Sequence, residues 1–241
     1  MARFSPPRLV GFDAALRFIE GLHLPGAAMV IGLDQPTIVP NARGSRPVER
    51  LAGSLVSWLG GGVQPSSRAR TGMFCDTAPL WPFIARLGAV QDPEAARGAS
   101  SGRFLLEVFP ALALPSLDAR FFGRKLAPKY NPALSAKFSI DAWRTVAAAV
   151  ARRFEAMAQA AAAAWCVQAG ALDRPRKADQ DMLDAMICLA VVMHWRLAPR
   201  DASILLGDER SGYIVAPASP QVRARLAGRA ADFGVPLDRF R

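Results

Sequence analysis

Three acidic residues lie where the neighbouring residues predict burial. Asp34 ends the small, apolar run AAMVIGL, and Pro36 closes that run two residues later. Glu107 is embedded in the apolar segment FLLEVF, and Asp184 precedes the run AMICLAVVM, which predicts a buried helix. A carboxylate in such a place is costly unless another group pairs with it or binds it.

Divalent-metal binding is the chemistry that these acids suit together. Asp181 lies three residues before Asp184 and therefore on the same helix face. Mg²⁺ prefers such hard oxygen ligands, and two ions about 4 Å apart can activate water for attack on a phosphodiester. Each acid also has a structural interpretation: Asp34 could cap a turn, Glu107 could pair with an arginine, and Asp181 could favour the start of its helix.

The overall charge favours a polyanionic partner. The 241 residues carry a net charge of +10, with a sequence pI near 10.7. Only four of the 30 basic residues are Lys, so part of this bias can reflect coding composition. The three Cys and two His residues are isolated, which argues against a disulfide framework, a zinc site and a His-based nucleophile. Without a long apolar span or a signal-like start, we expect a soluble, cytoplasmic protein with no membrane partner.

The elements that must position these acids alternate along the chain. Apolar periodicity predicts helices over 12–22, 48–59, 80–87, 140–168, 174–197 and 219–233. Strands are expected at 27–33 and 104–109, followed by a hairpin over 204–217. Residues 91–102 have the composition of a solvated linker. The pattern predicts an α/β fold in a single domain over 1–241, with insertions at about 60–79 and 118–138.

Several segments together resemble a known family. VIGLDQPTIVPNARGSRPVER, FLLEVFPALALPSL, KYNP, DQDMLDAMICLA and GYIVAPAS are similar to motifs of nucleases inferred to have a ribonuclease-H-like fold, grouped mainly as a domain of unknown function. The resemblance covers roughly residues 28–217. It implies a mixed sheet flanked by helices and metal-dependent phosphodiester hydrolysis with Mg²⁺ or Mn²⁺.

The resemblance also implies roles for particular residues. Asp34, Glu107 and Asp184 would be the catalytic carboxylates that face the metal, with Asp181 as a supporting metal ligand. Arg46 and Glu49 would line the same cleft. Arg46 and the nearby Arg50, Arg68 and Arg70 are also expected to flank it and to bind the phosphates of DNA or RNA.

One departure from the family pattern concerns the N-terminal hairpin of the ribonuclease-H-like fold, whose first strand carries an essential Asp. Only about ten residues precede the first expected helix here, and they include no strand with an acid. We therefore expect the hairpin to be missing and an unpaired sheet edge beside Asp34. Weak metal binding, slow or undetectable hydrolysis and self-association would follow.

Two other functions stay open at this level. The chain could be a non-catalytic module that binds nucleic acid or protein on the same fold, or a hydrolase that uses a carboxylate pair without metal. Metal titration separates the three: the nuclease needs Mg²⁺ or Mn²⁺, the module binds without turnover, and the hydrolase is insensitive to EDTA.

Overall fold

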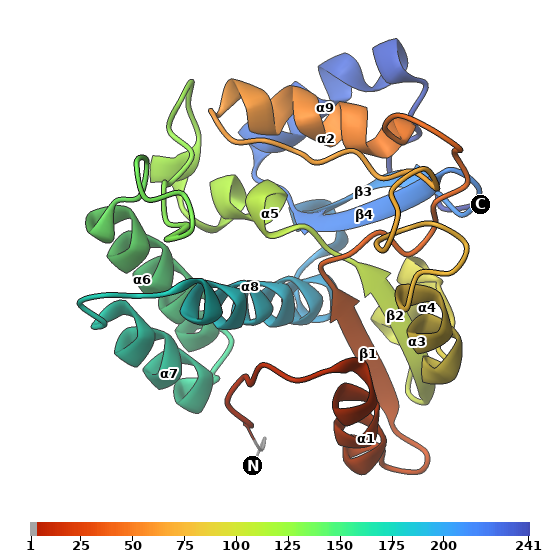
Figure 1. Cartoon of the computed structure of the whole chain (residues 1–241), viewed down its shortest axis with the longest axis horizontal. Coiled ribbons are helices and arrows are strands. Elements are labelled where there is room, and N and C mark those ends of the chain that lie inside the picture. Colours follow the sequence, from red (N-terminus) through yellow and green to blue (C-terminus); the bar gives the residue numbers. More distant parts are fainter. Residues whose placement is uncertain (1–3) are drawn as a thin grey trace.

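The computed structural model describes residues 4–241 and has the predicted α/β character (Figure 1). Residues 4–11 form no strand. The helices and strands are α1 (Phe12–Leu22), β1 (Ala28–Leu33), α2 (Pro47–Trp58), α3 (Leu80–Leu87), α4 (Pro93–Gly98), β2 (Gly102–Glu107), α5 (Pro110–Leu117), α6 (Ile140–Ala156), α7 (Ala160–Gly170), α8 (Lys177–Leu197), β3 (Ser203–Asp208), β4 (Gly212–Pro217) and α9 (Pro220–Phe233), with 3₁₀ turns at Ala119–Phe121 and Arg200–Ala202.

Two strand pairs form the centre of the molecule. β1 and β2 are parallel, and their register runs from Ala28 opposite Gly102 to Leu33 opposite Glu107. β3 and β4 form an antiparallel hairpin, and a single parallel bridge between Val108 and Val215 links this hairpin to the end of β2. Since the carboxyl ends of parallel strands share one edge, Asp34 and Glu107 emerge on the same side of the pair.

Helices cover the strand pairs from different sides (Figure 1). α2 and α9 lie together over the β3–β4 hairpin at the top of the view, whereas the long helix α8 crosses the centre beside β1 and β4. α8 approaches β1 closely at Gly32, where an added Cβ would lie 2.6 Å from the Val192 Cγ2 atom. This close packing holds the second half of α8 against β1, and the N-terminal half of α8 lines a cavity together with Asp34.

The helical region over 140–168 differs from the prediction, which was one long helix. The structure has two helices, α6 and α7, separated at residues 157–159, where Ala158 adopts a left-handed conformation with φ of 57°. The two helices then pack against each other, which buries alanine faces of both.

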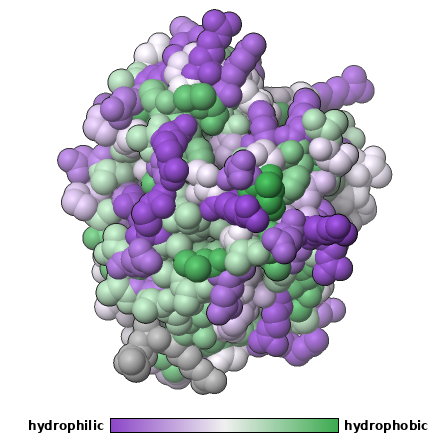
Figure 2. Space-filling view, turned by 90° about the vertical axis from the view of Figure 1, so that its left-hand side faces the viewer, coloured by the Kyte–Doolittle hydropathy of each residue, from purple (hydrophilic) through white to green (hydrophobic). Residues whose placement is uncertain are grey.

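Figure 2 shows the side of the molecule to the left of Figure 1, where hydrophilic side chains are interspersed with apolar ones.

The predicted linker over 91–102 is also corrected. Residues 93–98 form α4, because the Asp92 carboxylate accepts a hydrogen bond from the Ala95 N–H and Pro93 occupies the first turn. Pro93 and Ala96 are buried, and α4 packs on α8. The expected strand over 104–109 ends earlier, at Glu107, since Pro110 begins α5.

β1 is less buried than its apolar sequence predicts. All six of its residues are only partly buried, and within residues 4–241 the strand pairs along one edge, with β2. This agrees with the expected unpaired edge beside Asp34. Nearby α1 exposes Phe12, Phe18 and Leu22. Self-association through these apolar groups stays a prediction.

Among residues 4–241, every helix is too short or too polar to span a bilayer.

Candidate functional site

A large cavity opens where the carboxyl ends of β1 and β2 meet the start of α8. Its volume is about 880 Å³, and it extends along β1 and α8 to the long loop over 60–79. The four predicted metal-site acids all line this cavity, together with Arg46, Glu49 and Arg70. Residues from distant parts of the sequence therefore line one cavity, although their individual environments differ.

Asp34 and Asp184 form the electrostatic centre of the cavity. Partial desolvation and the negative charges of Asp184 and Glu107 raise the pKa of Asp34 from 3.8 to about 7. Desolvation raises the pKa of Asp184 from 3.8 to about 6, against the opposing effect of its hydrogen bonds. Water reaches Asp34 at the cavity surface and screens part of this repulsion. Desolvation and nearby negative charge therefore disfavour the ionised form of both carboxylates, and the effect of burial is smaller for Asp34, which is exposed, than for the half-buried Asp184.

Two neighbours orient the Asp184 carboxylate. The Tyr130 hydroxyl donates to Oδ1 at 2.7 Å, and the Gln180 Nε2 donates to Oδ2 at 2.7 Å. The other amide atom of Gln180, the buried Oε1, has no hydrogen-bond partner among the described residues. Gln180 thus leaves one buried acceptor unsatisfied next to the Asp184 carboxylate.

Asp181 has a more peripheral position. Its carboxylate pairs with Lys177, one turn earlier on the exposed side of α8. The same Lys177 charge acts to lower the pKa values of both Asp34 and Asp184. Lys177 therefore supplies part of the positive charge at this end of the cavity.

Glu107 has a different environment from the one predicted. It is buried, and Arg46 donates to both of its oxygens, from Nη2 at 2.5 Å and from Nη1 at 3.0 Å, while the Thr37 N–H donates to Oε2 at 2.9 Å. Burial raises the pKa of Glu107, whereas these bonds favour the ionised form, and the bidentate contact supports an ion pair. Glu107 therefore fits the structural interpretation of this acid, in which it pairs with an arginine.

Arg46 and Glu49 extend this pair into a buried cluster. Only 1% of the Arg46 residue is exposed, and its Nε donates to Glu49 at 2.9 Å. Glu49 also accepts hydrogen bonds from the backbone N–H groups of Arg46 and Ser66. The Arg46 guanidinium is consequently committed to protein groups, in contrast to its expected contact with substrate, and the cluster ties α2 to β2 and to the long loop.

The other predicted phosphate-binding arginines are not equivalent. Arg70 is half-buried and lines the cavity, where its Nη1 donates to the Pro65 carbonyl at 3.0 Å. Arg68 is exposed and pairs with Asp76, and Arg50 lies exposed on α2, away from the residues that line the cavity. Of the four, Arg70 is best placed to meet a ligand in the cavity.

The donor groups limit the kind of metal site that can form. Within residues 4–241, no group of three or more His, Cys, Asp or Glu side chains is arranged to hold a metal ion. Asp34 and Asp184 would supply only two carboxylates to a metal ion, so water would have to complete most of the coordination, as Mg²⁺ commonly requires. Tyr130 and Gln180 were not among the predicted site residues. Gln180 lies four residues before Asp184 on the same helix, a spacing that indicates contact between the two side chains.

Together, the fold and the cavity define an α/β protein with an acidic site at the carboxyl ends of a parallel strand pair. The chain belongs to the family described as Protein of unknown function (DUF429), whose model matches residues 8–211. Neither a search of curated proteins nor a search of solved structures finds a significant match.

The raised pKa values predict how stability depends on pH. Between about pH 4 and 7 the folded state holds protons on Asp34 and Asp184 that the unfolded state has lost, so the free energy of unfolding should fall as pH rises through this range. Thermal unfolding between pH 4 and 8 measures this change. The decrease should be smaller in Asp34→Asn, and a decrease of equal size in that variant would contradict the assignment.

Proposed function

We propose that this protein is a metal-dependent phosphodiesterase acting on nucleic acid, with Asp34 and Asp184 as the ligands of Mg²⁺ or Mn²⁺. The observation that carries the proposal is the pair of carboxylates, from β1 and α8, whose pKa values are raised to about 7 and about 6 in one open cavity. A bound divalent cation would offset their repulsion and would supply an activated water and charge stabilisation for the leaving oxygen.

The protein groups around the pair support this chemistry. Tyr130 and Gln180 hold the Asp184 carboxylate in one orientation, as groups behind metal ligands commonly do. Arg70 and Lys177 line the same cavity and can bind the phosphates of an extended strand. In this proposal Glu107 acts through Arg46 as a structural support of the cavity, and Asp181 lies at its rim.

The ribonuclease-H-like arrangement is part of the same proposal. A parallel strand pair with acids at its carboxyl ends, and a helix that adds another acid, are the features that support it. The non-catalytic binding module is the second candidate. One specific observation favours it. Glu107 is engaged in an ion pair with Arg46, so only two carboxylates without an arginine partner, those of Asp34 and Asp184, remain at the centre of the site to bind a metal.

Labelled single-stranded DNA, single-stranded RNA and duplex DNA test the two candidates directly. We expect slow cleavage with Mg²⁺ or Mn²⁺, none with EDTA, and binding that weakens steeply as salt concentration rises. Binding without cleavage at any metal concentration would favour the module. Cleavage that persists in EDTA, or no binding at low salt, would contradict the metal-dependent proposal.

A further inference from the structure

A second cavity lies on a different part of the molecule from the acidic site. Its volume is about 820 Å³, and it is formed by the end of α6, the end of α8 with the following turn, and the start of α9. Most of its lining is apolar: Ala156, Met157, Leu197, Ala198, Pro199, Ala202, Ala218 and Pro220. Its charged lining residues are two arginines, Arg153 and Arg223, and one exposed acid, Asp201.

Arg153 is the unusual member of this lining. It is half-buried, yet among the described residues no acid is close enough to form an ion pair with it, and its buried Nε has no hydrogen-bond partner. Burial lowers its pKa, as expected for a cation without a counterion. Leaving a charge in this state is costly, and an anion in the cavity would remove the cost.

The other polar groups of the cavity are compatible with an anion. Arg223 donates to Asp238 and to the Ser203 carbonyl, but its buried Nε also has no partner in the described part of the chain. His194 is buried, and its Nε2 donates to the Ala202 carbonyl at 2.9 Å. Burial lowers the pKa of His194, which favours the neutral ring, so the positive charge of the cavity comes from its arginines.

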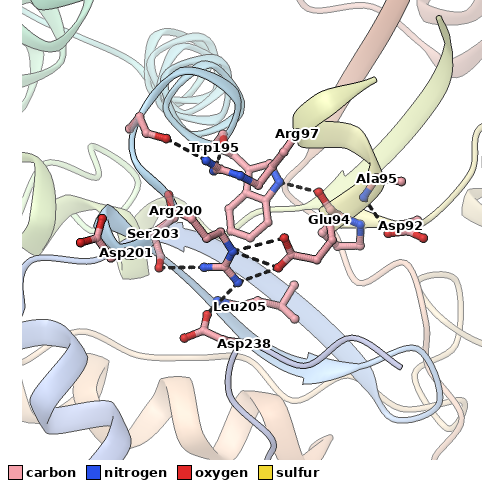
Figure 3. A network of polar contacts seen from close by, with 12 residues as sticks. Asp92, Glu94, Ala95, Arg97, Trp195, Arg200, Asp201, Ser203, Leu205 and Asp238 are labelled. Atoms are coloured by element: carbon pink, nitrogen blue, oxygen red, sulfur yellow. Dashed lines mark hydrogen bonds and ion pairs between the residues drawn. The ribbon is translucent and has the colours of Figure 1, made fainter. Parts of the chain in front are cut away.

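A network of polar contacts holds one wall of the cavity in place (Figure 3). Arg97 donates to the carbonyls of Trp195 and Ala198, which close the end of α8. Arg200 donates to Glu94 at 2.6 Å and to Asp238 at 2.9 Å, and its guanidinium lies 4.7 Å from the centre of the Trp195 ring. The turn that lines the cavity is therefore preorganised, which reduces the entropy lost on binding.

We propose that this cavity binds a small organic anion, a molecule with an apolar body and a phosphate or carboxylate group that pairs with Arg153. The apolar lining would enclose the body, and the guanidinium of Arg153, which lines the cavity without a counterion among the described residues, would pair with the anionic group. This site is independent of the acidic cavity and of the function proposed for it.

Isothermal titration with hexyl phosphate, hexanoate, inorganic phosphate and hexanol tests the proposal. We expect hexyl phosphate or hexanoate to bind more tightly than inorganic phosphate, and hexanol to bind weakly or not at all. Arg153→Gln should weaken anion binding about tenfold or more. Arg152→Gln is the matched control, since Arg152 is the exposed neighbour on α6 and pairs with Asp118 outside the cavity.

A second variant tests the cavity without changing its charge. Ala156→Phe places a large side chain at an exposed position of the lining and should block the anion while leaving the fold intact by circular dichroism. Asp34→Asn should bind the anion like the unmodified protein. Equal affinity for hexanol, no binding of either hexyl anion, or unchanged binding in both Arg153→Gln and Ala156→Phe would each overturn the proposal.

Discussion

Replacing Arg46 with methionine is expected to lower the free energy of unfolding by about 3–5 kcal/mol, the usual cost of breaking a buried ion pair from one side. Arg46 is the cation of a buried cluster in which Glu107 and Glu49 supply two carboxylates. Without the guanidinium, both acids would be buried with no countercharge. Chemical denaturation at pH 8 measures the loss.

Arg50→Met provides the matched control, because Arg50 lies four residues later on the exposed face of α2. Its free energy of unfolding should change by less than about 0.5 kcal/mol. The loss in Arg46→Met should also be smaller at pH 5 than at pH 8, because burial raises the pKa of Glu107 and this carboxylate can then take up a proton. Similar stabilities of the two variants at pH 8 would show that the cluster does not support the fold.

Removing either central carboxylate should abolish metal-dependent cleavage. We expect Asp34→Asn and Asp184→Asn each to reduce the cleavage rate by more than about 100-fold, since loss of a group that only orients a metal ligand already costs about 10–100-fold. Tyr130→Phe removes such an orienting hydrogen bond to Asp184 and should fall within that smaller range. Cleavage rates on one labelled strand at saturating Mg²⁺ provide the comparison.

Two controls separate this effect from misfolding. Asp173→Asn changes an exposed acid that precedes α8 and should leave cleavage unchanged. Asp34→Asn and Asp184→Asn should be at least as stable as the unmodified protein at pH 8, because each substitution removes repulsion between carboxylates. Full cleavage by either variant would show that the metal is bound elsewhere.

Much of the secondary structure could be predicted from local patterns. The helices at Phe12–Leu22 and Leu80–Leu87 have the predicted bounds, because apolar periodicity within one segment specifies which face is buried. The same reasoning identified Asp34 and Asp184 as acids at the ends of apolar segments, and both line the cavity. The break at Ala158 was missed, since alanine favours a helix and packing of α6 on α7 determines the turn.

The sequence alone identifies the positions at which an acid borders or interrupts an apolar segment. Only the tertiary structure shows which of these acids has an ion-pair partner. Glu107 and Arg46 are 61 residues apart, and their contact depends on how the tertiary structure brings the start of α2 to the end of β2. The Tyr130 hydroxyl reaches Asp184 from an irregular segment with no periodicity to reveal it. The pairing of a buried charge depends on groups brought near it in space, and the order of residues along the chain does not encode that proximity locally.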